Sequence, residues 1–306
     1  MLQRAATTKP DSRLWALQAR YAPYLFISPF VILFCIFLIY PLVRSLMLSV
    51  HKTAGPNVQI FVGMGNYVFL FKDQIFWWAT LNTVVYTIAY LMFQVPLSLG
   101  LAMLVNHSKL RGRNFFRFAF FTPNLVGAVF LGVLFALFLS PRNGPVNAVL
   151  TVLGVRNPPN WLGDPNLVMV AVLIASLWVS VGFGMMYCLA ALQAVERELY
   201  EAADVDGAGK FAKFRHVTLP SVRPVLSFLI MIGTIGSLQI FELPYVLFAG
   251  AGPNNRALTI VMYLFNVGFE QGDLGYAAAI GWVLVLLVAG IGAIGAQAVT
   301  RAGRKA

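Results

Sequence analysis

Six long apolar stretches constrain this chain more than any other feature of its sequence. They cover residues 22–43, 79–105, 118–139, 167–192, 224–250 and 274–300. Each can cross a hydrocarbon core, which needs about 20 apolar residues in a helix. Lipid cannot satisfy free backbone hydrogen bonds, so such stretches are expected to be helical. The sequence therefore predicts an all-α polytopic membrane protein with six transmembrane helices, and its 11% of charged residues excludes a water-soluble domain.

The distribution of Lys and Arg predicts which ends of the spans face the cytoplasm. The N-terminus, the C-terminus and the connections after the second and fourth spans together hold 16 of the 22 basic residues. Membrane proteins retain basic residues on the cytoplasmic side, so both termini are expected there. We expect residues 1–20 to form a cytoplasmic leader and residues 21–306 to form a single membrane domain whose first span is not cleaved.

The connection between the fourth and fifth spans, residues 196–220, differs from a passive polar loop. Residues 196–203 are good helix formers, with acids in the first turns where the helix dipole favours negative charge. Gly207 then predicts a left-handed turn, and a second short helix carrying Phe211 follows before Pro220. Two short helices at an angle suit a groove in a soluble partner, and an amphipathic helix resting on lipid is the alternative.

The same residues resemble a known motif. Glu201-Ala202-Ala203, Gly207 and Val217-Thr218-Leu219-Pro220 are similar to the EAA pattern of binding-protein-dependent ABC importer permeases, E-A-A-x3-G-x9-I-x-L-P. Val217 for Ile is the one departure from that pattern. Shorter stretches resemble the sugar-uptake branch, with its maltose and glycerol-phosphate permeases: Ser28-Pro29-Phe30, Tyr40-Pro41, Gly65-Asn66-Tyr67, Asn82-Thr83, Asp206-Gly207-Ala208, Gly252-Pro253 and Leu274-Gly275-Tyr276-Ala277.

The resemblance implies a permease subunit of an ATP-driven sugar importer in a bacterial inner membrane, with the type I importer fold. In this family two homologous permease subunits form the pathway, and an external solute-binding protein delivers the sugar. Two ATPase subunits hold ATP and Mg, so this chain is expected to carry no cofactor and no enzymatic activity. The loop corresponds to the coupling helix that enters an ATPase cleft. The resemblance thus assigns coupling roles to Glu201, Ala202, Ala203, Asp206, Gly207, Phe211, Leu219 and Pro220.

Polar and aromatic side chains inside the spans are candidates for sugar contacts. Polar groups are costly in lipid, and sugars are bound by hydrogen bonds and aromatic faces. The resemblance places Ser180 and Phe183 at sugar-contacting positions and gives residues 237–242 as a second window. Helix-to-helix bonding or packing is the alternative for each residue, and an ion pair with a partner subunit is the alternative for Glu242. The candidates are Asn82, Tyr86, Trp178, Ser180, Phe183, Ser237, Gln239, Phe241 and Glu242.

Glu242 also leaves a second class of transporter open, a proton-coupled carrier that uses this carboxylate. Such carriers usually show inverted repeats and more spans, and no convincing repeat is visible here. No nucleophile, base and orienting group assemble in the sequence, so an enzyme is not predicted. The scattered histidines predict no metal site. The stretch 207–210 fails as a phosphate loop, because Phe211 stands where Ser or Thr is needed.

Overall fold

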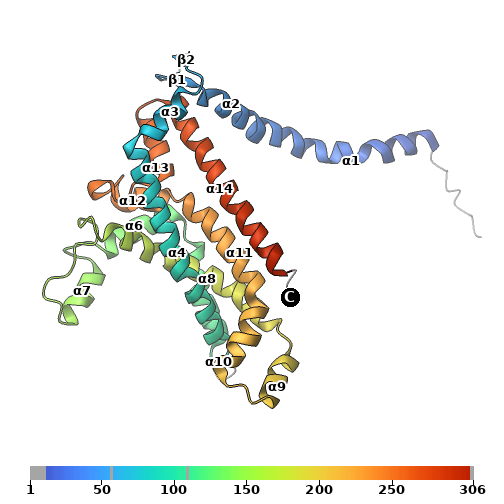
Figure 1. The fold of residues 1–306 in the computed structure, drawn as a ribbon, viewed down its shortest axis with the longest axis vertical. Coiled ribbons are helices and arrows are strands. Elements are labelled where there is room, and N and C mark those ends of the chain that lie inside the picture. The colour runs from blue at the N-terminus through green and yellow to red at the C-terminus, as the bar shows by residue number, and fades with distance from the viewer. Residues whose placement is uncertain (1–11, 56–57, 108–109, 304–306) are drawn as a thin grey trace, which may run out of the picture.

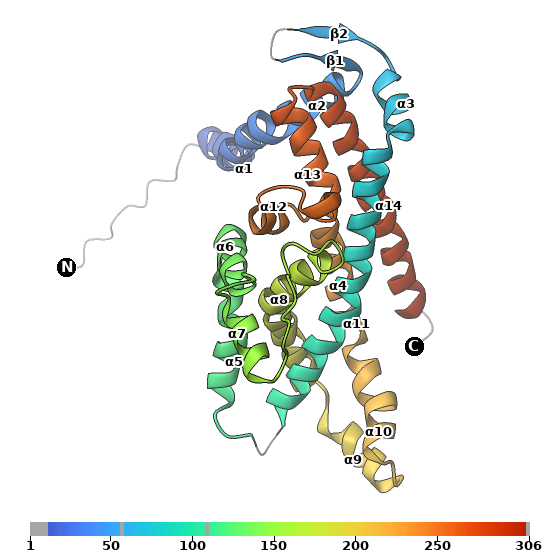
Figure 2. The same ribbon diagram turned by 90° about the vertical axis from the view of Figure 1, so that its left-hand side faces the viewer.

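The structure is a computed structural model that describes residues 12–55, 58–107 and 110–303. Four long helices pack along one another and form its body: α4 (Gln74–Asn106), α8 (Val168–Gln193), α11 (Leu219–Leu238) and α14 (Leu274–Gly303) (Figures 1 and 2). The first eleven residues of the expected leader lie outside the described residues, and the rest of it begins the first helix.

The remaining elements connect or cover these four helices. A two-stranded antiparallel hairpin lies at one end of the body, called the hairpin end, and α9 and α10 lie at the other, called the elbow end (Figure 1). The elements are α1 (Ser12–Phe34), π-helical η1 (Cys35–Ile39), α2 (Tyr40–Ser49), β1 (His51–Thr53), β2 (Gln59–Phe61), α3 (Gly65–Lys72), α5 (Arg113–Phe121), η2 (Thr122–Leu125), α6 (Ala128–Phe138), α7 (Pro145–Val152), α9 (Arg197–Val205), α10 (Lys210–Lys213), π-helical η3 (Phe214–Thr218), α12 (Glu242–Phe248), η4 (Pro253–Asn255), α13 (Ile260–Phe265) and π-helical η5 (Asn266–Glu270).

The number of spans agrees with the sequence prediction. Within the described residues, five helices are long and apolar enough to cross a membrane, and a sixth joins them if the bent pair α5 and α6 is one span. The fold is helical apart from the small hairpin among these residues. The short apolar helix formed by α13 and η5 is too short to span and lies between the body and the hairpin end.

Two of the predicted spans are not continuous helices. The third stretch bends by 103° between η2 and α6, where Pro123 has no N–H to donate and Gly127 is extended. The fifth stretch ends as α11 at Leu238, and α12 starts only at Glu242 in a different direction (Figure 2). At this second break the Thr259 hydroxyl donates to the Ile240 carbonyl oxygen at 2.8 Å, which satisfies a backbone group that the helix has released.

The first span stands apart from the body. Helix α1 continues through η1 into α2 and points away from the other helices (Figure 1). Its apolar stretch, Arg20–Ser49, buries almost nothing inside this chain, whereas half of the α8 stretch is buried. Only its last part, α2, packs on α14. The chain alone therefore leaves α1 to be covered by lipid or by another protein.

Two carboxylates fasten the hairpin end. Asp273 accepts hydrogen bonds from the Thr53 amide at 3.3 Å and the Thr53 hydroxyl at 3.2 Å, which joins β1 to the start of α14. Asp73, at the N-cap of α4, accepts the hydroxyl of Tyr276 at 2.6 Å and also that of Tyr263. Three helices, α4, α13 and α14, therefore meet at one carboxylate.

Helix α8 is the centre of the packing because glycines let its neighbours approach. A Cβ atom at Gly182 would lie 1.7 Å from the Phe120 carbonyl oxygen of α5. A Cβ atom at Gly184 would lie 2.3 Å from the Ser98 hydroxyl oxygen of α4. That hydroxyl donates to the Val181 carbonyl oxygen at 3.1 Å. Small residues and interhelical hydrogen bonds of this kind drive helix association in membranes.

We expect Gly182→Ala to destabilise the fold, because the methyl group must push α5 and α8 apart. Overpacking costs about 1–3 kcal/mol, and here the obstacle is backbone. The thermal unfolding midpoint of the purified protein in detergent should fall clearly. Gly100→Ala is the control, because its new Cβ has open space around it. Equal midpoints for the two variants would contradict the close approach of α5 and α8.

Candidate functional site

A cavity of about 310 Å³ lies in the middle of the body, where α4, α8 and α11 meet the starts of α6 and α12. Its walls combine tyrosine rings, hydroxyl groups and aliphatic side chains. The lining residues are Tyr86, Tyr90, Val126, Ala128, Leu131, Ser176, Val179, Ile232, Gly233, Gly236, Ser237 and Leu243. Two of the sequence candidates, Tyr86 and Ser237, are therefore brought together here, although they stand far apart in the chain.

Two tyrosines and two serines form a regular ladder along one side of the cavity. The Tyr86 hydroxyl of α4 donates to the Ser176 hydroxyl of α8 at 2.8 Å. One turn further, the Tyr90 hydroxyl interacts with Ser180. The two rings stack with centroids 5.8 Å apart. Residues four apart share a helix face, so two parallel helices in register repeat the same contact.

The opposite wall is formed by α11, where small residues leave room. Ser237 is buried, and its hydroxyl donates to the Thr234 carbonyl oxygen at 3.1 Å. A Cβ atom at Gly236 would have open space around it, whereas one at Gly233 would lie 2.8 Å from a Leu91 methyl. The cavity thus pairs aromatic faces with a few hydroxyl groups inside apolar walls, the composition typical of small-ligand sites.

Asn82 lies nearer the hairpin end and has a different environment. Its side-chain amide donates to the Asn255 carbonyl oxygen at 2.8 Å and to the Leu258 carbonyl oxygen at 3.0 Å. Both amide protons are therefore engaged by the loop after α12. The neighbouring Thr83 hydroxyl accepts the Ile260 amide at 3.0 Å. Together they hold this loop against α4.

The three candidates on α8 point in different directions. The Ser180 hydroxyl donates to the Ser176 carbonyl oxygen at 2.8 Å and also meets Tyr90. Trp178 is 45% exposed and packs edge-on against Phe135 of α6, with centroids 5.7 Å apart. Phe183 lies toward the elbow end, where it packs in the cluster formed by the lower parts of α4, α8 and α11. Of these three, Ser180 interacts with Tyr90, which lines the cavity.

The last three candidates occupy the break between α11 and α12. Gln239 and Glu242 are exposed, and Phe241 packs on Phe265 with ring centroids 5.1 Å apart. The one ion pair among the described residues is elsewhere, so Glu242 has no basic partner within this part of the chain. Its carboxylate is therefore open to water or to another molecule at the start of α12.

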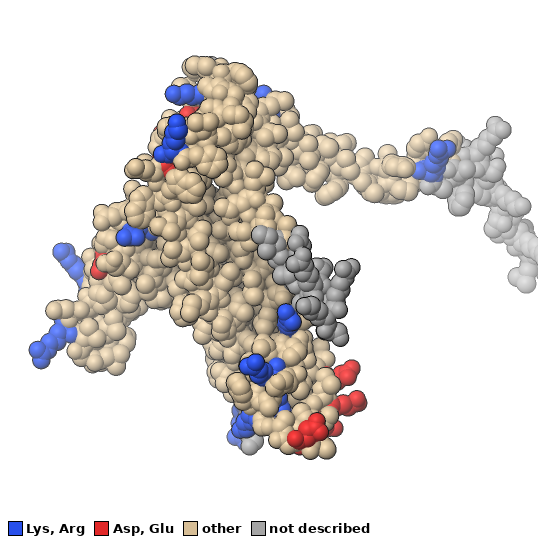
Figure 3. Space-filling model, viewed as in Figure 1, with Lys and Arg blue, Asp and Glu red and all other residues tan. Residues whose placement is uncertain are grey.

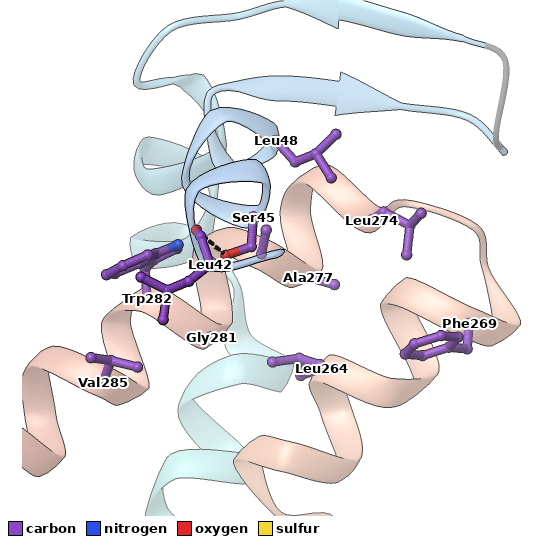
Figure 4. A pocket seen from close by; sticks show the side chains of 11 residues that line it. Leu42, Ser45, Leu48, Leu264, Phe269, Leu274, Ala277, Gly281, Trp282 and Val285 are labelled. Atoms are coloured by element: carbon purple, nitrogen blue, oxygen red, sulfur yellow. Dashed lines mark hydrogen bonds between the residues drawn. The ribbon is translucent and has the colours of Figure 1, made fainter. Parts of the chain in front are cut away.

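A larger groove of about 540 Å³ runs between α2, α14 and the segment from α13 to η5. Its walls are aliphatic and aromatic side chains, among them Leu264, Phe269 and Trp282 (Figure 4). The Ser45 hydroxyl is already donated to the Leu42 carbonyl oxygen at 2.9 Å (Figure 4). A polyhydroxylated ligand needs several polar partners, so this groove suits it poorly.

The elbow, defined as α9, α10 and η3, has the shape that the sequence predicts. Helix α9 ends at Val205, and Gly207 takes a left-handed conformation with φ 72°. The Ala208 amide then donates to the Ala203 carbonyl oxygen at 2.9 Å and closes the turn. Such a cap favours glycine because a side chain at positive φ is strained. Helix α10 and η3 lead back into α11.

The tip of the elbow, at α9 and the turn that follows it, is both acidic and apolar. Val205 is 88% exposed and Phe211 is 73% exposed, beyond the apolar part of the bundle. Acidic side chains gather at the tip that α9 forms (Figure 3). Of the residues assigned to coupling, Ala203 is half-buried, and Glu201, Ala202, Asp206, Gly207, Phe211, Leu219 and Pro220 are exposed.

The inner face of α9 carries residues that sequence analysis did not select. The Tyr200 hydroxyl lies 3.0 Å from the Thr218 hydroxyl, and Lys213 forms an ion pair with Asp204. The spacing of Tyr200 and Asp204 places them on one helix face, which is visible in the sequence. Their partners, Thr218 and Lys213, cannot be identified from the sequence, because the geometry of the turn at Gly207 determines which residues face α9.

Comparisons with known proteins identify relatives along nearly the whole chain. The family described as binding-protein-dependent transport system inner membrane component matches residues 94–305. The arabinooligosaccharides transport system permease protein AraP of Bacillus subtilis is 38% identical, over 87% of this chain and 85% of the relative. The lactose transport system permease protein LacF of Rhizobium radiobacter is 37% identical, over 87% of this chain and 90% of the relative.

Solved structures are also similar to nearly the whole chain. One chain of a bacterial ABC transporter involved in the import of the acidic polysaccharide alginate has a TM-score of 0.82 and 26% identity, covering 95% of this chain and 99% of that chain. A bacterial alginate ABC transporter in complex with its alginate pentasaccharide-bound periplasmic protein has a TM-score of 0.79 and 25% identity, covering 93% and 96%. The comparisons give no support to a proton-coupled carrier.

Proposed function

The chain belongs to the binding-protein-dependent transport system inner membrane components, the permease subunits of ABC importers, and we propose that its substrate is an oligosaccharide or a related glycoside. In this proposal the chain forms half of the pathway, and a second homologous permease subunit forms the other half. Two ATPase subunits bind ATP and Mg, and an external solute-binding protein delivers the sugar. The proposal assigns the cofactors to the ATPase subunits and none to this chain.

The exposed elbow is the observation that carries the proposal for ATP coupling. Val205 and Phe211 expose large apolar surfaces at the end of the molecule where the basic connections also lie. Exposed apolar side chains beyond the membrane helices suit contact with a protein or with lipid, and the proposal takes the protein. Acidic side chains around them favour a partner groove with positive charge. We assign this groove to the ATPase subunits, with Glu201, Ala202 and Gly207 at the contact.

The same assignment orients the chain. An ATPase is cytoplasmic, so the elbow end faces the cytoplasm and the hairpin end faces outward. We keep the prediction, made from the excess of basic residues, that both termini are cytoplasmic. The exposed α1 is left free to pack on the second permease subunit. The solute-binding protein would approach the hairpin end.

The central cavity supports the sugar assignment. Stacked Tyr86 and Tyr90 offer aromatic faces, and Ser176 and Ser237 offer hydroxyl groups at its walls. The relatives reported above carry names that refer to arabinooligosaccharides, lactose and alginate, all of them carbohydrates. We place the sugar path along this cavity and past Gln239 and Glu242 at the break. Asn82 and Phe183 lie outside this path. Asn82 holds the loop after α12, and Phe183 packs between the helices at the elbow end.

Purification of the complex from its native host tests the proposal directly. We expect an ATPase, a second permease and a solute-binding protein to be recovered with the chain. In proteoliposomes, uptake of a glycoside should require ATP and persist when a protonophore removes the proton gradient. Uptake that survives ATP depletion and collapses with the proton gradient would instead favour a carrier based on Glu242.

We expect Gly207→Val to uncouple ATP hydrolysis from uptake, because a β-branched residue is strained at φ 72°. The strain costs on the order of 1–3 kcal/mol and opens the turn between α9 and α10. Glycoside uptake should fall about tenfold or more while the complex still hydrolyses ATP.

Gly209→Val is the matched control for this elbow variant. Gly209 has an ordinary extended backbone with φ −68°, and its Cβ position is open. Uptake by that variant should stay within about twofold of wild type, because any residue adopts this conformation. Equal effects of the two substitutions would show that the turn geometry is unimportant.

We expect Gly236→Leu to block uptake by filling the central cavity. The Cβ atom at this position has open space, so the side chain can enter the cavity without a backbone clash. Leucine is also a better helix former than glycine by about 0.8 kcal/mol, so the fold should be retained. Uptake should fall strongly with normal amounts of assembled complex. Gly100→Leu, another open helix position, should leave uptake unchanged.

A further inference from the structure

The inner face of α9 is held by two contacts that lie one helical turn apart. Tyr200 and Asp204 are four residues apart on α9, and both point toward the segment after the turn. The Tyr200 hydroxyl lies 3.0 Å from the Thr218 hydroxyl oxygen. The Asp204 carboxylate forms an ion pair with Lys213. The outer face of the same helix stays exposed.

The π-helical segment η3 sets the positions of the two partners. A π-helix bonds residues five apart, so Thr218 stands over Lys213 on one side of the chain. The Thr218 hydroxyl donates to the Lys213 carbonyl oxygen at 3.5 Å. In the 3.0 Å contact between the Tyr200 and Thr218 hydroxyls, either group can be the donor. Three groups form a short chain from α9 to η3.

The two contacts differ in strength. Thr218 is 6% exposed, so its bond to Tyr200 is shielded from water. The Asp204 side chain is 64% exposed, and surface ion pairs of this kind contribute little and weaken with salt. The bond between Tyr200 and Thr218 is therefore the main connection between α9 and η3.

Beyond η3 the connection continues into the membrane bundle. Phe214 of η3 and Val222 of α11 pack in a cluster with the lower parts of α4 and α8. Val222 is completely buried in it. A displacement of α9 is thus transmitted through Thr218 to η3 and the start of α11. These segments pack against α4 and α8. Without the hydroxyl contact, α9 keeps its chain connections, which are the link of residues 194–196 to α8 and the turn at Gly207, together with the exposed ion pair.

We propose that Tyr200 and Thr218 are positioning residues. Their bond holds α9 against the start of α11, so that motion of the ATPase subunits reaches the pathway. The inference rests on the proposed function and adds residues that contact neither the sugar nor the nucleotide. The outer face of α9 binds the partner, and the inner face transmits its displacement. This division of one helix between two tasks follows from the contacts above.

Isosteric variants in the assembled complex test the role of the bond between Tyr200 and Thr218. Tyr200→Phe and Thr218→Val remove the hydroxyl groups and keep the shapes. In proteoliposomes, the number of sugar molecules taken up per ATP hydrolysed should fall about three- to tenfold, the range that loss of one neutral hydrogen bond gives. The double variant should lower this ratio no further than the more affected single variant does, because both substitutions remove the same bond.

Two control variants separate positioning from general damage. Thr218→Ser keeps the hydroxyl group and should retain the wild-type ratio. Ser221→Ala removes a hydroxyl that donates to the Val217 carbonyl oxygen four residues earlier in the chain, and it should also behave as wild type. Asp204→Asn should lower the ratio of sugar taken up to ATP hydrolysed less than Tyr200→Phe does. High salt should reduce the difference between Asp204→Asn and wild type.

Several outcomes would overturn the proposal. Wild-type ratios in both isosteric variants would show that the bond transmits nothing. A parallel loss of uptake and hydrolysis, or failure of both variants to assemble while Thr218→Ser assembles, would show that the bond only maintains the fold. Additive effects in the double variant would show two independent roles. If the wild-type complex itself lacks ATP-dependent uptake, the proposed function fails instead.

Discussion

The close packing of α4 against α8 is the interaction on which the rest of the structure depends. Gly182 and Gly184 let α5 and α4 approach the α8 backbone, and the Ser98 hydroxyl joins the two long helices at Val181. In lipid there is no hydrophobic gain from bringing apolar helices together, so close contact and interhelical bonds decide the arrangement. The parallel register that results aligns Tyr86 with Ser176 and Tyr90 with Ser180.

The break after α11 is stabilised by hydrogen bonds from neighbouring elements, α4 among them. At the break after α11, released backbone groups must find partners inside the membrane region. Thr259 supplies one of them at Ile240, and Asn82 and Thr83 of α4 hold the loop that follows. Both breaks lie beside the central cavity, where α6 and α12 begin. Irregular backbone at this depth is therefore found where it lines a cavity.

The elbow and the cavity are connected through α11. The elbow presents apolar and acidic side chains outward and is joined inward to α11 through Thr218, Phe214 and Val222. Helix α11 continues to Gly236 and Ser237 at the cavity wall. A push on α9 consequently acts on the same helix that forms one wall of the proposed sugar path. Bundles of this kind change between discrete packings, because close-packed interfaces do not deform continuously.

The sequence by itself determined the membrane class, the number of apolar spans, the family resemblance and the left-handed turn at Gly207. Span length and a glycine turn are local properties, so they can be read along the chain without knowing what packs where. Only the tertiary structure decided that the third and fifth stretches break, that Asn82 holds a loop, and that Tyr200 meets Thr218. These features depend on which distant segments become neighbours. That choice is made by close helix approach and by the partners available to buried polar groups, and neither leaves a periodic signal in one stretch of sequence.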